Sequence, residues 1–413
     1  MSVDVFSDSD IKAKENLQQR HRWGKLWQGV FFLSTFIGVV MLVLLLLSII
    51  NQSFGYVVWT YKVPPQSLSE KAIDELRSEE LVDIIRKNIR PLRLRTIEKE
   101  KPLDSRTQEE LVNLVMEKVV EPKVLKTYSL YDSLFFRKEI EAEAKEEYQE
   151  GILTFHAWLN DKFLERSMSS QAQLAGVRSA LKGSLLMILI MIVIAFPIGI
   201  AAAIYLEEYA DPSRRINRII QTNIDNLSGV PSIVYGILGL AIFVRSLEPL
   251  TSGAMFGIQG GNGRTILSAG LTLALLILPM LIINGQEAIR AVPNSLRLAS
   301  YGVGATKWQT VWFHVLPQAM PGILTGTILS ISRAIGETAP LILVGASTFI
   351  SSDPEGVFSK FTALPIQIYN WTMRPQAEFR NIAAAAILVL LAALLTLNAT
   401  AILLRNYFVS KRK

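Results

Sequence analysis

The sequence has no cysteine and only three histidines among its 413 residues. Without cysteine, the chain can form neither a disulfide framework nor a thiolate metal site. The histidines stand far apart, without the spacing of metal ligands, at His21, His156 and His314. The sequence also lacks the glycine-rich loop that cradles nucleotide phosphates, whose pattern is Gly, four residues, Gly-Lys and Ser or Thr. The stretch from Gly302 to Lys307 does not contain the Gly-Lys part of this pattern. We therefore expect no metal, no cofactor and no catalytic residue.

Charged residues are scarce as well, at 19% of the chain, whereas hydrophobic residues make up 50%. The hydrophobic residues are pooled into six blocks, each near the roughly 17–25 residues that a helix needs to cross a bilayer. This pattern predicts an all-α polytopic membrane protein with six transmembrane helices. The six blocks are Gly29–Ile50, Ser184–Leu206, Ser228–Val244, Ile266–Ile283, Pro321–Ala346 and Ile382–Leu404.

The first block has about 22 residues, which is too long for the apolar region of a cleavable signal. We expect it to remain in the membrane. Aromatic residues of the kind that anchor proteins at the membrane surface stand near the ends of the blocks, so lipids are expected partners. These residues are Trp27, Trp59, Tyr61 and Trp371.

The formal net charge is +6, and the basic surplus lies beside the apolar blocks, where it indicates orientation rather than nucleic-acid binding. If the N-terminal segment is cytoplasmic, the short flanks on that side carry 15 Lys and Arg, against 5 on the other side. This asymmetry predicts that both termini are cytoplasmic. The expected order is a cytoplasmic segment 1–28, a first span 29–50, an extracytoplasmic insertion 51–180, a five-helix core 181–405 with a cytoplasmic loop 284–320, and a tail 406–413.

The insertion is expected to be helical, because capping-box patterns precede apolar residues at helical spacing. One box is Ser67–Glu70 and the other is Thr107–Glu110. A third, charged helix is predicted from about Arg137 to Arg166. Each predicted helix has one apolar face, which favours packing of the helices on each other or on a partner.

The stretch from Glu287 to Pro317 is unusually long and mostly uncharged for a connection between two membrane spans. Its apolar positions need a protein surface to cover them, and its pattern predicts two short helices around a turn at Gly302 and Gly304. Such a helical knob can transmit the motion of a cytoplasmic subunit into the membrane as a rigid body. The alternative is an ordinary loop between helices.

This stretch resembles the loop of binding-protein-dependent ABC permeases, whose pattern is Glu-Ala-Ala, three residues, Gly, nine residues and Ile-x-Leu-Pro. Aligned on Gly304, the nine residues are Ala305–Phe313, and His314 then stands where the family has Ile. Leu298 replaces the family's Glu. The resemblance implies docking to an ATPase subunit, and the positions that match the pattern or flank it are Leu298, Ala299, Ser300, Gly304, Ala305, Trp308, Leu316 and Pro317.

Three further stretches resemble the phosphate-specific members of this family. Ser332–Pro340 is similar to their Arg-Ala-x-Gly-Glu-Thr-Ala-Pro signature, and Asn226–Gly236 is similar to their Ser-x-Pro-Ser-Ile-Val-x-Gly segment. Pro197–Leu206 resembles the span before it. The resemblance covers about residues 175–405 in the expected order. The A-type subunits fit best, although the paired C-type subunits share the Arg…Gly-Glu-Thr element, and nothing transfers onto residues 51–180.

Arg333 and Glu337 stand four residues apart inside the fifth block, so a continuous helix would put them on one face, close enough to pair. An ionisable group there costs about 2.5–3.5 kcal/mol on insertion scales and usually faces a partner or a cavity. One interpretation is a salt bridge that only makes the helix insertable. The other is an anion relay, in which Arg333 takes phosphate oxygens and Glu337 holds it when the pathway is empty, with Thr338 and Ser332 as neutral donors.

The resemblance implies one permease subunit of a phosphate importer in the bacterial inner membrane. The implied partners are a second, C-type permease, two ATPase subunits, an extracytoplasmic phosphate-binding protein and inorganic phosphate itself. One alternative keeps the importer and changes the substrate to sulfate, molybdate or an organic solute. Another is a membrane sensor or scaffold with residues 51–180 as its recognition domain, although only short loops and a tail would then serve as cytoplasmic output.

Overall fold

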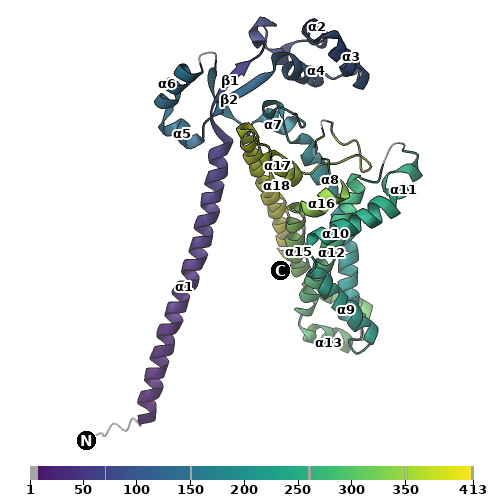
Figure 1. The fold of residues 1–413 in the computed structure, drawn as a ribbon. Helices are drawn as coiled ribbons and strands as arrows, with labels where there is room; N and C mark the ends of the chain where they lie inside the picture. The colour runs from purple at the N-terminus through teal and green to yellow at the C-terminus, as the bar shows by residue number, and fades with distance from the viewer. Residues whose placement is uncertain are drawn as a thin grey trace.

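The computed structural model describes residues 8–69, 71–148, 151–258, 262–347, 349–350 and 352–410. These residues form a bundle of long apolar helices, with a smaller domain of mixed structure at one end (Figure 1). Most of the described chain is helical, which confirms the predicted helical membrane bundle, although the described chain is not all-α. The first seven and last three residues of the predicted terminal segments lie outside the described residues.

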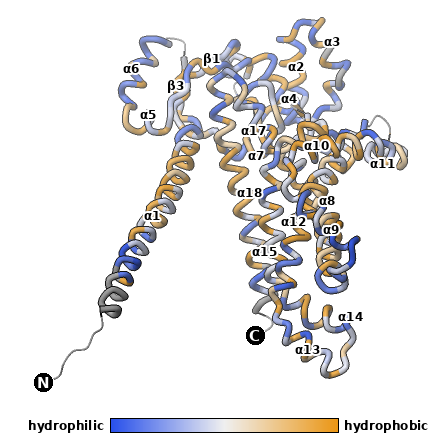
Figure 2. The backbone as a smooth tube through the Cα atoms, turned by 60° about the horizontal axis from the view of Figure 1, so that its bottom comes forward, coloured by the Kyte–Doolittle hydropathy of each residue, from blue (hydrophilic) through white to orange (hydrophobic). Residues whose placement is uncertain are grey.

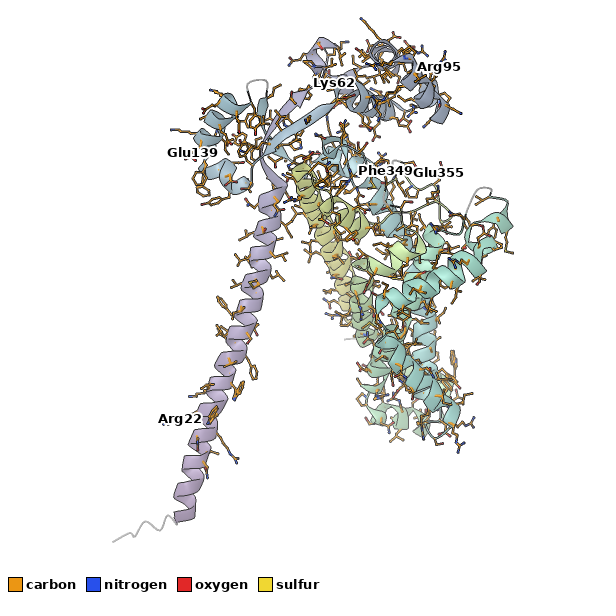
Figure 3. The ribbon with its side chains drawn as sticks, viewed as in Figure 1. Arg22, Lys62, Arg95, Glu139, Phe349 and Glu355 are labelled. Carbon is orange, nitrogen blue, oxygen red and sulfur yellow. The ribbon has the colours of Figure 1, made fainter. Side chains whose placement is uncertain are left out.

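The first helix, α1 (Asp8–Ser53), is 46 residues long and stands apart from the rest of the bundle (Figure 1). It contains the predicted span Gly29–Ile50 and contacts α18 (Ala377–Ser410). Its apolar side chains are exposed in the isolated chain. A helix that is apolar on all sides is not stable in water. Lipid or another membrane subunit therefore has to cover α1. Figure 3 marks Arg22 near its free end.

The core of the bundle lies around α12 (Ile266–Arg290), which packs against α8 (Arg178–Ile204) and α15 (Leu316–Ile335). The α8 helix runs on through a π-helical turn at Tyr205–Tyr209. The buried side chains are aliphatic and closely interlocked, and they include Met187, Met191, Leu273, Ile277, Leu281 and Ile331. Small residues let these helices approach closely, as is usual where no hydrophobic effect drives association.

The predicted third block is the second half of a bent pair. α9 (Arg215–Ser228) and α10 (Ser232–Gly239), which continues as a π-helix at Leu240–Ser246, meet at an angle of 107°. Pro231 lies at the bend, where its ring disfavours helical geometry in the residue before it. The described part of the chain therefore contains five helices long and apolar enough to cross a membrane, or six if the bent pair counts as one span.

The predicted fifth block, Pro321–Ala346, is also not one continuous helix. α15 ends at Ile335, three residues intervene, and α16 (Ala339–Val344) follows in a new direction. Pro340 in the first turn of α16 has no backbone N–H to donate, so it suits a helix start and not a helix interior. The short helices α11 (Glu248–Thr251) and α17 (Leu364–Thr372) complete this end of the bundle.

The insertion, which we define as residues 54–177, contains a sheet that the sequence did not predict. Strands β1 (Phe54–Tyr61), β2 (Pro122–Thr127) and β3 (Ile152–Ala157) pair antiparallel in the order β2-β1-β3. The predicted helix from Arg137 to Arg166 is therefore wrong, because α6 (Arg137–Glu147) ends before β3, and α7 (Asp161–Glu165) follows it. Long-range pairing with β1 overrides the local helical preference of this charged segment.

Three helices form a separate small core in the insertion: α2 (Ser78–Asn88), α3 (Pro91–Glu100) and α4 (Gln108–Val115). The capping box at Thr107 is confirmed, since its side chain accepts from the Glu110 N–H and Glu110 accepts from the Thr107 N–H. The box at Ser67–Glu70 starts no long helix: α2 begins only at Ser78, after two short 3₁₀ turns, and Glu70 lies outside the described residues.

Ion pairs connect the insertion to the bundle. Arg178 at the start of α8 contacts Asp353 at 3.0 Å and Glu109 of α4 at 3.2 Å. Lys182 adds a contact to Asp353 at 2.6 Å. Burial alone would raise the pKa of Asp353, but hydrogen bonds from Lys182 and Arg178, together with their positive charges, outweigh it and lower the pKa, so the carboxylate stays charged at neutral pH. The insertion is thus fastened to the loop that follows α16.

We predict that replacing Gly236 with Ala destabilises the bundle. An added Cβ would lie 2.6 Å from Pro340 Cα, so α10 and α16 would have to separate. Overpacking of this kind costs roughly 1–3 kcal/mol. The measurement is the thermal unfolding temperature of the purified protein in detergent. Gly38→Ala is the matched control, since nothing lies within 4 Å of its added Cβ; equal unfolding temperatures for the two variants would contradict the packing.

Candidate functional site

The break between α15 and α16 carries both ionisable residues of the fifth block. Arg333 lies in the last turn of α15, and Glu337 follows the end of that helix. Their side chains approach to 3.7 Å between Nε and Oε1. Arg333 also lies 3.0 Å from the sulfur of Met280 on α12. The two residues therefore pair across a helix end, rather than along one helix face as the spacing suggested.

This ion pair is loose and open on one side. The Arg333 side chain is 47% exposed and that of Glu337 19%. At 3.7 Å, the contact is longer than a charge-assisted hydrogen bond of about 2.7–2.9 Å. The guanidinium has five N–H donors in a planar fork, so it can donate hydrogen bonds to a second anion and keep part of its contact with Glu337.

The two predicted neutral donors occupy different positions. Ser332 donates to the carbonyl of Ile328 at 2.8 Å and contacts Asn398 of α18 at 2.6 Å, so its hydroxyl is engaged with a neighbouring helix. Thr338 is half-buried in the break itself, directly before α16. Thr338 thus adjoins Glu337 in the break, whereas the Ser332 hydroxyl bonds toward α18.

Two of the sequence signatures meet at this break. α16, from the Ser332–Pro340 stretch, packs on α10, from the Asn226–Gly236 stretch, with Gly236 against Pro340. The Tyr235 hydroxyl donates to the Leu227 carbonyl at 2.7 Å, which ties α10 back across its own bend. Sequence reasoning named both stretches but gave no reason for them to touch.

The knob between α12 and α15 lies at the end of the bundle opposite the insertion (Figures 1 and 2). It consists of α13 (Asn294–Gly302), α14 (Lys307–Thr310) and a π-helical turn, Val311–Val315. Gly304 forms the turn with φ +85°, a conformation that favours glycine. A buried contact of 2.9 Å between the Ser300 and Thr310 hydroxyls holds the two helices together. The predicted helix-turn-helix form is confirmed.

The knob exposes several large apolar side chains. Val303 is 85% exposed, and the rings of Trp308 and Trp312 stack at 5.4 Å. Leu298, Ala299 and Gly304 are exposed, whereas Ala305, Leu316 and Pro317 are half-buried and Ser300 is buried in the contact to Thr310. Exposed patches of this kind mark interaction sites. The exposed members that share this surface are Leu298, Tyr301, Val303, Trp308, Trp312 and Phe313.

A buried ion pair attaches the knob to the end of α8. Arg297 of α13 contacts Glu208 at 2.7 Å, and their side chains are only 14% and 6% exposed. Arg297 also donates to the carbonyls of Ile289 and Val292, at 3.0 and 2.7 Å. The charges are thus paired and the guanidinium is bonded on several sides, as a buried cation requires.

A second, more exposed pair lies beside it. Arg290 at the end of α12 donates two hydrogen bonds to Glu207, at 3.0 and 2.9 Å. Glu207 and Glu208 are thus each paired with an arginine of a later segment. The sequence did contain a signal for these ion pairs, because two adjacent acids follow one span and arginines follow a later one. Sequence spacing, however, does not show which acid pairs with which arginine.

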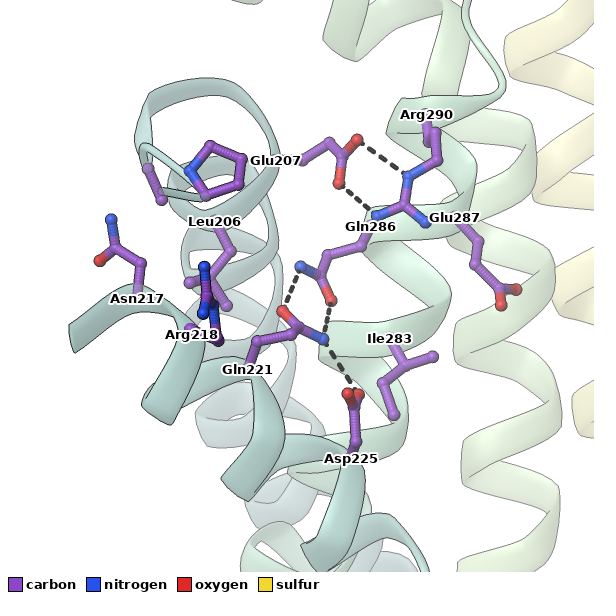
Figure 4. Close-up of a pocket in the computed structure, with 12 residues that line it drawn as sticks. Leu206, Glu207, Asn217, Arg218, Gln221, Asp225, Ile283, Gln286, Glu287 and Arg290 are labelled. Atoms are coloured by element: carbon purple, nitrogen blue, oxygen red, sulfur yellow. Dashed lines mark hydrogen bonds and ion pairs between the residues drawn. The ribbon is translucent and has the colours of Figure 1, made fainter. Parts of the chain in front are cut away.

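A polar cleft of about 540 Å³ opens next to this second pair (Figure 4). Gln286 of α12 donates to Gln221 of α9 at 2.9 Å, and Gln221 donates to Asp225 at 3.0 Å. These bonds tie α9 to α12 at the same end of the bundle as the knob. The cleft is lined by α9, α12 and the turn that follows α8, and the Glu207–Arg290 pair connects the last two. These three segments therefore form one polar cluster.

His156 lies in the insertion and His314 in the knob. His156 in β3 packs edge-on against Trp59 and Trp158, and burial lowers the pKa of His156, so it is neutral at neutral pH. His314 lies in the π-helical turn of the knob. Within the described residues, no three His, Asp or Glu side chains are grouped to hold a metal ion.

Comparison with known proteins relates the bundle to one family. Residues 195–413 match the family of binding-protein-dependent transport system inner membrane components. The chain is 40% identical over 241 residues to the phosphate transport system permease protein PstA 1 of Mycobacterium tuberculosis H37Rv, covering 58% of this chain and 71% of that one. It is 36% identical over 240 residues to PstA of Yersinia pestis, covering 57% and 74%.

A further relative is the probable ABC transporter permease protein YqgI of Bacillus subtilis, 32% identical over 246 residues that cover 56% of this chain and 79% of that protein. Among solved structures, the inward-facing MetNI methionine ABC transporter is similar with a TM-score of 0.41 and 16% identity, covering 56% and 95%. The family match contains the bent pair, the knob and the break, and it excludes the insertion. The chain belongs to the family of binding-protein-dependent transport system inner membrane components.

Proposed function

We propose that the chain is a permease subunit of an ATP-driven importer and that its substrate is inorganic phosphate. The observation that carries the proposal is the Arg333–Glu337 pair at the break, within a stretch similar to phosphate transport permeases. Ionisable side chains in a membrane segment are costly to bury, so they usually pair with each other or line a substrate pathway. The loose contact leaves Arg333 able to exchange its carboxylate for a passing oxyanion.

The pair also supports phosphate over sulfate as the substrate. At neutral pH phosphate keeps a proton that it can donate to the acceptor-only carboxylate of Glu337, while its other oxygens accept from Arg333. Sulfate has no proton to donate and would meet Glu337 as a like charge. Thr338, next to Glu337 in the chain, can donate a hydrogen bond to either anion but can accept one only from phosphate. Binding-site discrimination would therefore rest on Glu337 more than on Arg333.

The knob supports coupling to an ATPase subunit. Its exposed apolar surface needs a partner, and this chain has no nucleotide site in its sequence. In this proposal the knob is cytoplasmic, as are both termini, and the insertion lies outside the membrane on the opposite side. A second permease of the C-type, two ATPase subunits and an extracytoplasmic phosphate-binding protein complete the importer in the inner membrane.

Arg333→Ala should lower phosphate uptake by roughly 10- to 100-fold, because it removes charge-assisted hydrogen bonds of about 1.5–3 kcal/mol from the transported anion. Uptake of labelled phosphate into vesicles that hold the reconstituted complex measures this loss. Ser332→Ala is the matched control, since that hydroxyl bonds to Ile328 and Asn398. Normal uptake by the assembled Arg333→Ala complex would refute the relay. In the unchanged complex, inhibition of labelled phosphate uptake by sulfate as strong as that by unlabelled phosphate would refute phosphate as the specific substrate.

Glu208→Gln should reduce the phosphate carried per ATP hydrolysed, because it leaves Arg297 buried without its counter-charge. Breaking a buried pair costs about 3–5 kcal/mol, whereas an exposed pair contributes about 0–1 kcal/mol. Glu207→Gln, which breaks the exposed pair with Arg290, is the control and should change the ratio much less. The measurement is simultaneous phosphate uptake and ATP hydrolysis in reconstituted vesicles; an unchanged ratio in Glu208→Gln would contradict transmission through this contact.

A further inference from the structure

A short helix in the insertion has an apolar surface that no described residue covers. This is α5 (Leu130–Phe135), in which Leu134 is 66% and Phe135 70% exposed. Tyr131 and Phe136 beside them are exposed as well. Figure 2 shows α5 as a hydrophobic segment next to the hydrophilic α6. Four large exposed apolar side chains within the six residues 131–136 are unusual on a surface that faces water.

Direct contacts fix α5 to the end of the first membrane helix. The Tyr131 N–H donates to the Asn51 side chain of α1 at 2.7 Å. The Ser133 hydroxyl accepts from the Tyr56 N–H at 2.8 Å, and it donates to the Ser129 carbonyl at 2.6 Å. Ser133 is buried, so α5 is held against both α1 and the start of β1. The contact with Asn51 therefore fixes the position of α5 along the axis of α1.

Asn51 directly follows the apolar block Gly29–Ile50. That block of about 22 residues is roughly 33 Å long as a helix, close to the roughly 30 Å of a hydrocarbon core. The block therefore ends at the boundary between acyl chains and headgroups. α5 lies beside this end of α1, on the side away from α18 (Figures 1 and 2), so its exposed side chains are at the same boundary.

We propose that α5 is an interfacial anchor, whose Tyr131, Leu134, Phe135 and Phe136 side chains insert into the headgroup and acyl boundary of the bilayer. Aromatic and aliphatic side chains on a short surface helix are suited to this zone. The predicted anchors Trp59 and Trp371 are wrong for this role, because both are buried in the protein. The anchor would fix the tilt of the insertion relative to the membrane surface.

Apolar burial, and not attraction to anionic headgroups, drives this contact. The following helix α6 carries three basic and five acidic residues, so its net charge is negative. Arg137, the basic residue nearest to α5, is paired with Glu141 at 2.8 Å. The insertion depth of α5 should therefore not depend on the charge of the lipid.

Spin labels test the anchor directly, because the chain has no cysteine of its own. Phe135→Cys and, separately, Leu134→Cys are labelled with a nitroxide in the full-length protein in phosphatidylcholine nanodiscs. Glu139→Cys on α6, marked in Figure 3, is the control. Labels at 134 and 135 should gain relaxation by oxygen and lose relaxation by a water-soluble nickel chelate, relative to the label at 139.

Two results would overturn the proposal. Labels at 134 and 135 that are as accessible to the chelate as the label at 139 would place α5 in water. Labels shielded from both oxygen and the chelate would place α5 against protein. Replacing part of the phosphatidylcholine with phosphatidylglycerol should leave the result unchanged, and insertion that occurs only with the anionic lipid would contradict burial as its cause.

Discussion

The buried ion pair between Glu208 and Arg297 holds three helix ends of the bundle together. It joins the end of α8 to α13, and Arg297 simultaneously bonds to carbonyls at the end of α12. A charge pair that is removed from water tolerates little change in geometry, because losing either partner leaves the other charge uncompensated. These contacts therefore attach the knob to the ends of α8 and α12.

A helical rod connects the knob with the ion pair at the break. From Lys307 to Ile335 the chain runs through α14, the π-helical turn and α15 as one stretch of 29 residues, or roughly 43 Å. Trp308 lies near one end of this rod and Arg333 near the other. Continuous helical backbone therefore links Trp308 with Arg333, and in our proposal a displacement of the knob reaches Arg333 along it. Glu337 lies in the break after Ile335, outside both helices.

The sequence predicted those parts of the fold that depend on local pattern. The membrane helices followed from apolar length, the start of α4 from the capping box at Thr107, and the knob from its glycine turn. The sheet of the insertion was missed because β1 pairs with strands about 60 and 90 residues away, and such pairing leaves little local signal in a charged segment such as Arg137–Arg166.

The candidate site was predicted in composition but not in geometry. Arg333, Glu337 and Thr338 do lie together, yet the helix end between Arg333 and Glu337 was not anticipated, although Pro340 was a visible signal for it. Ser332 points toward α18 because it lies on another face of α15. The roles of Glu207 and Glu208 required three-dimensional knowledge, since their arginine partners are 83 and 89 residues away.

Our proposal places the knob in the cytoplasm, bound there to an ATPase subunit. Labelling of Val303→Cys by a membrane-impermeant thiol reagent tests both points, with Arg95→Cys in the insertion as the reference. In cells whose inner membrane is intact, the reagent should label only position 95. After permeabilisation position 303 should be labelled, and the ATPase subunit should protect it. Labelling of position 303 from outside the intact membrane, or no protection by the ATPase subunit, would refute the proposed orientation and coupling.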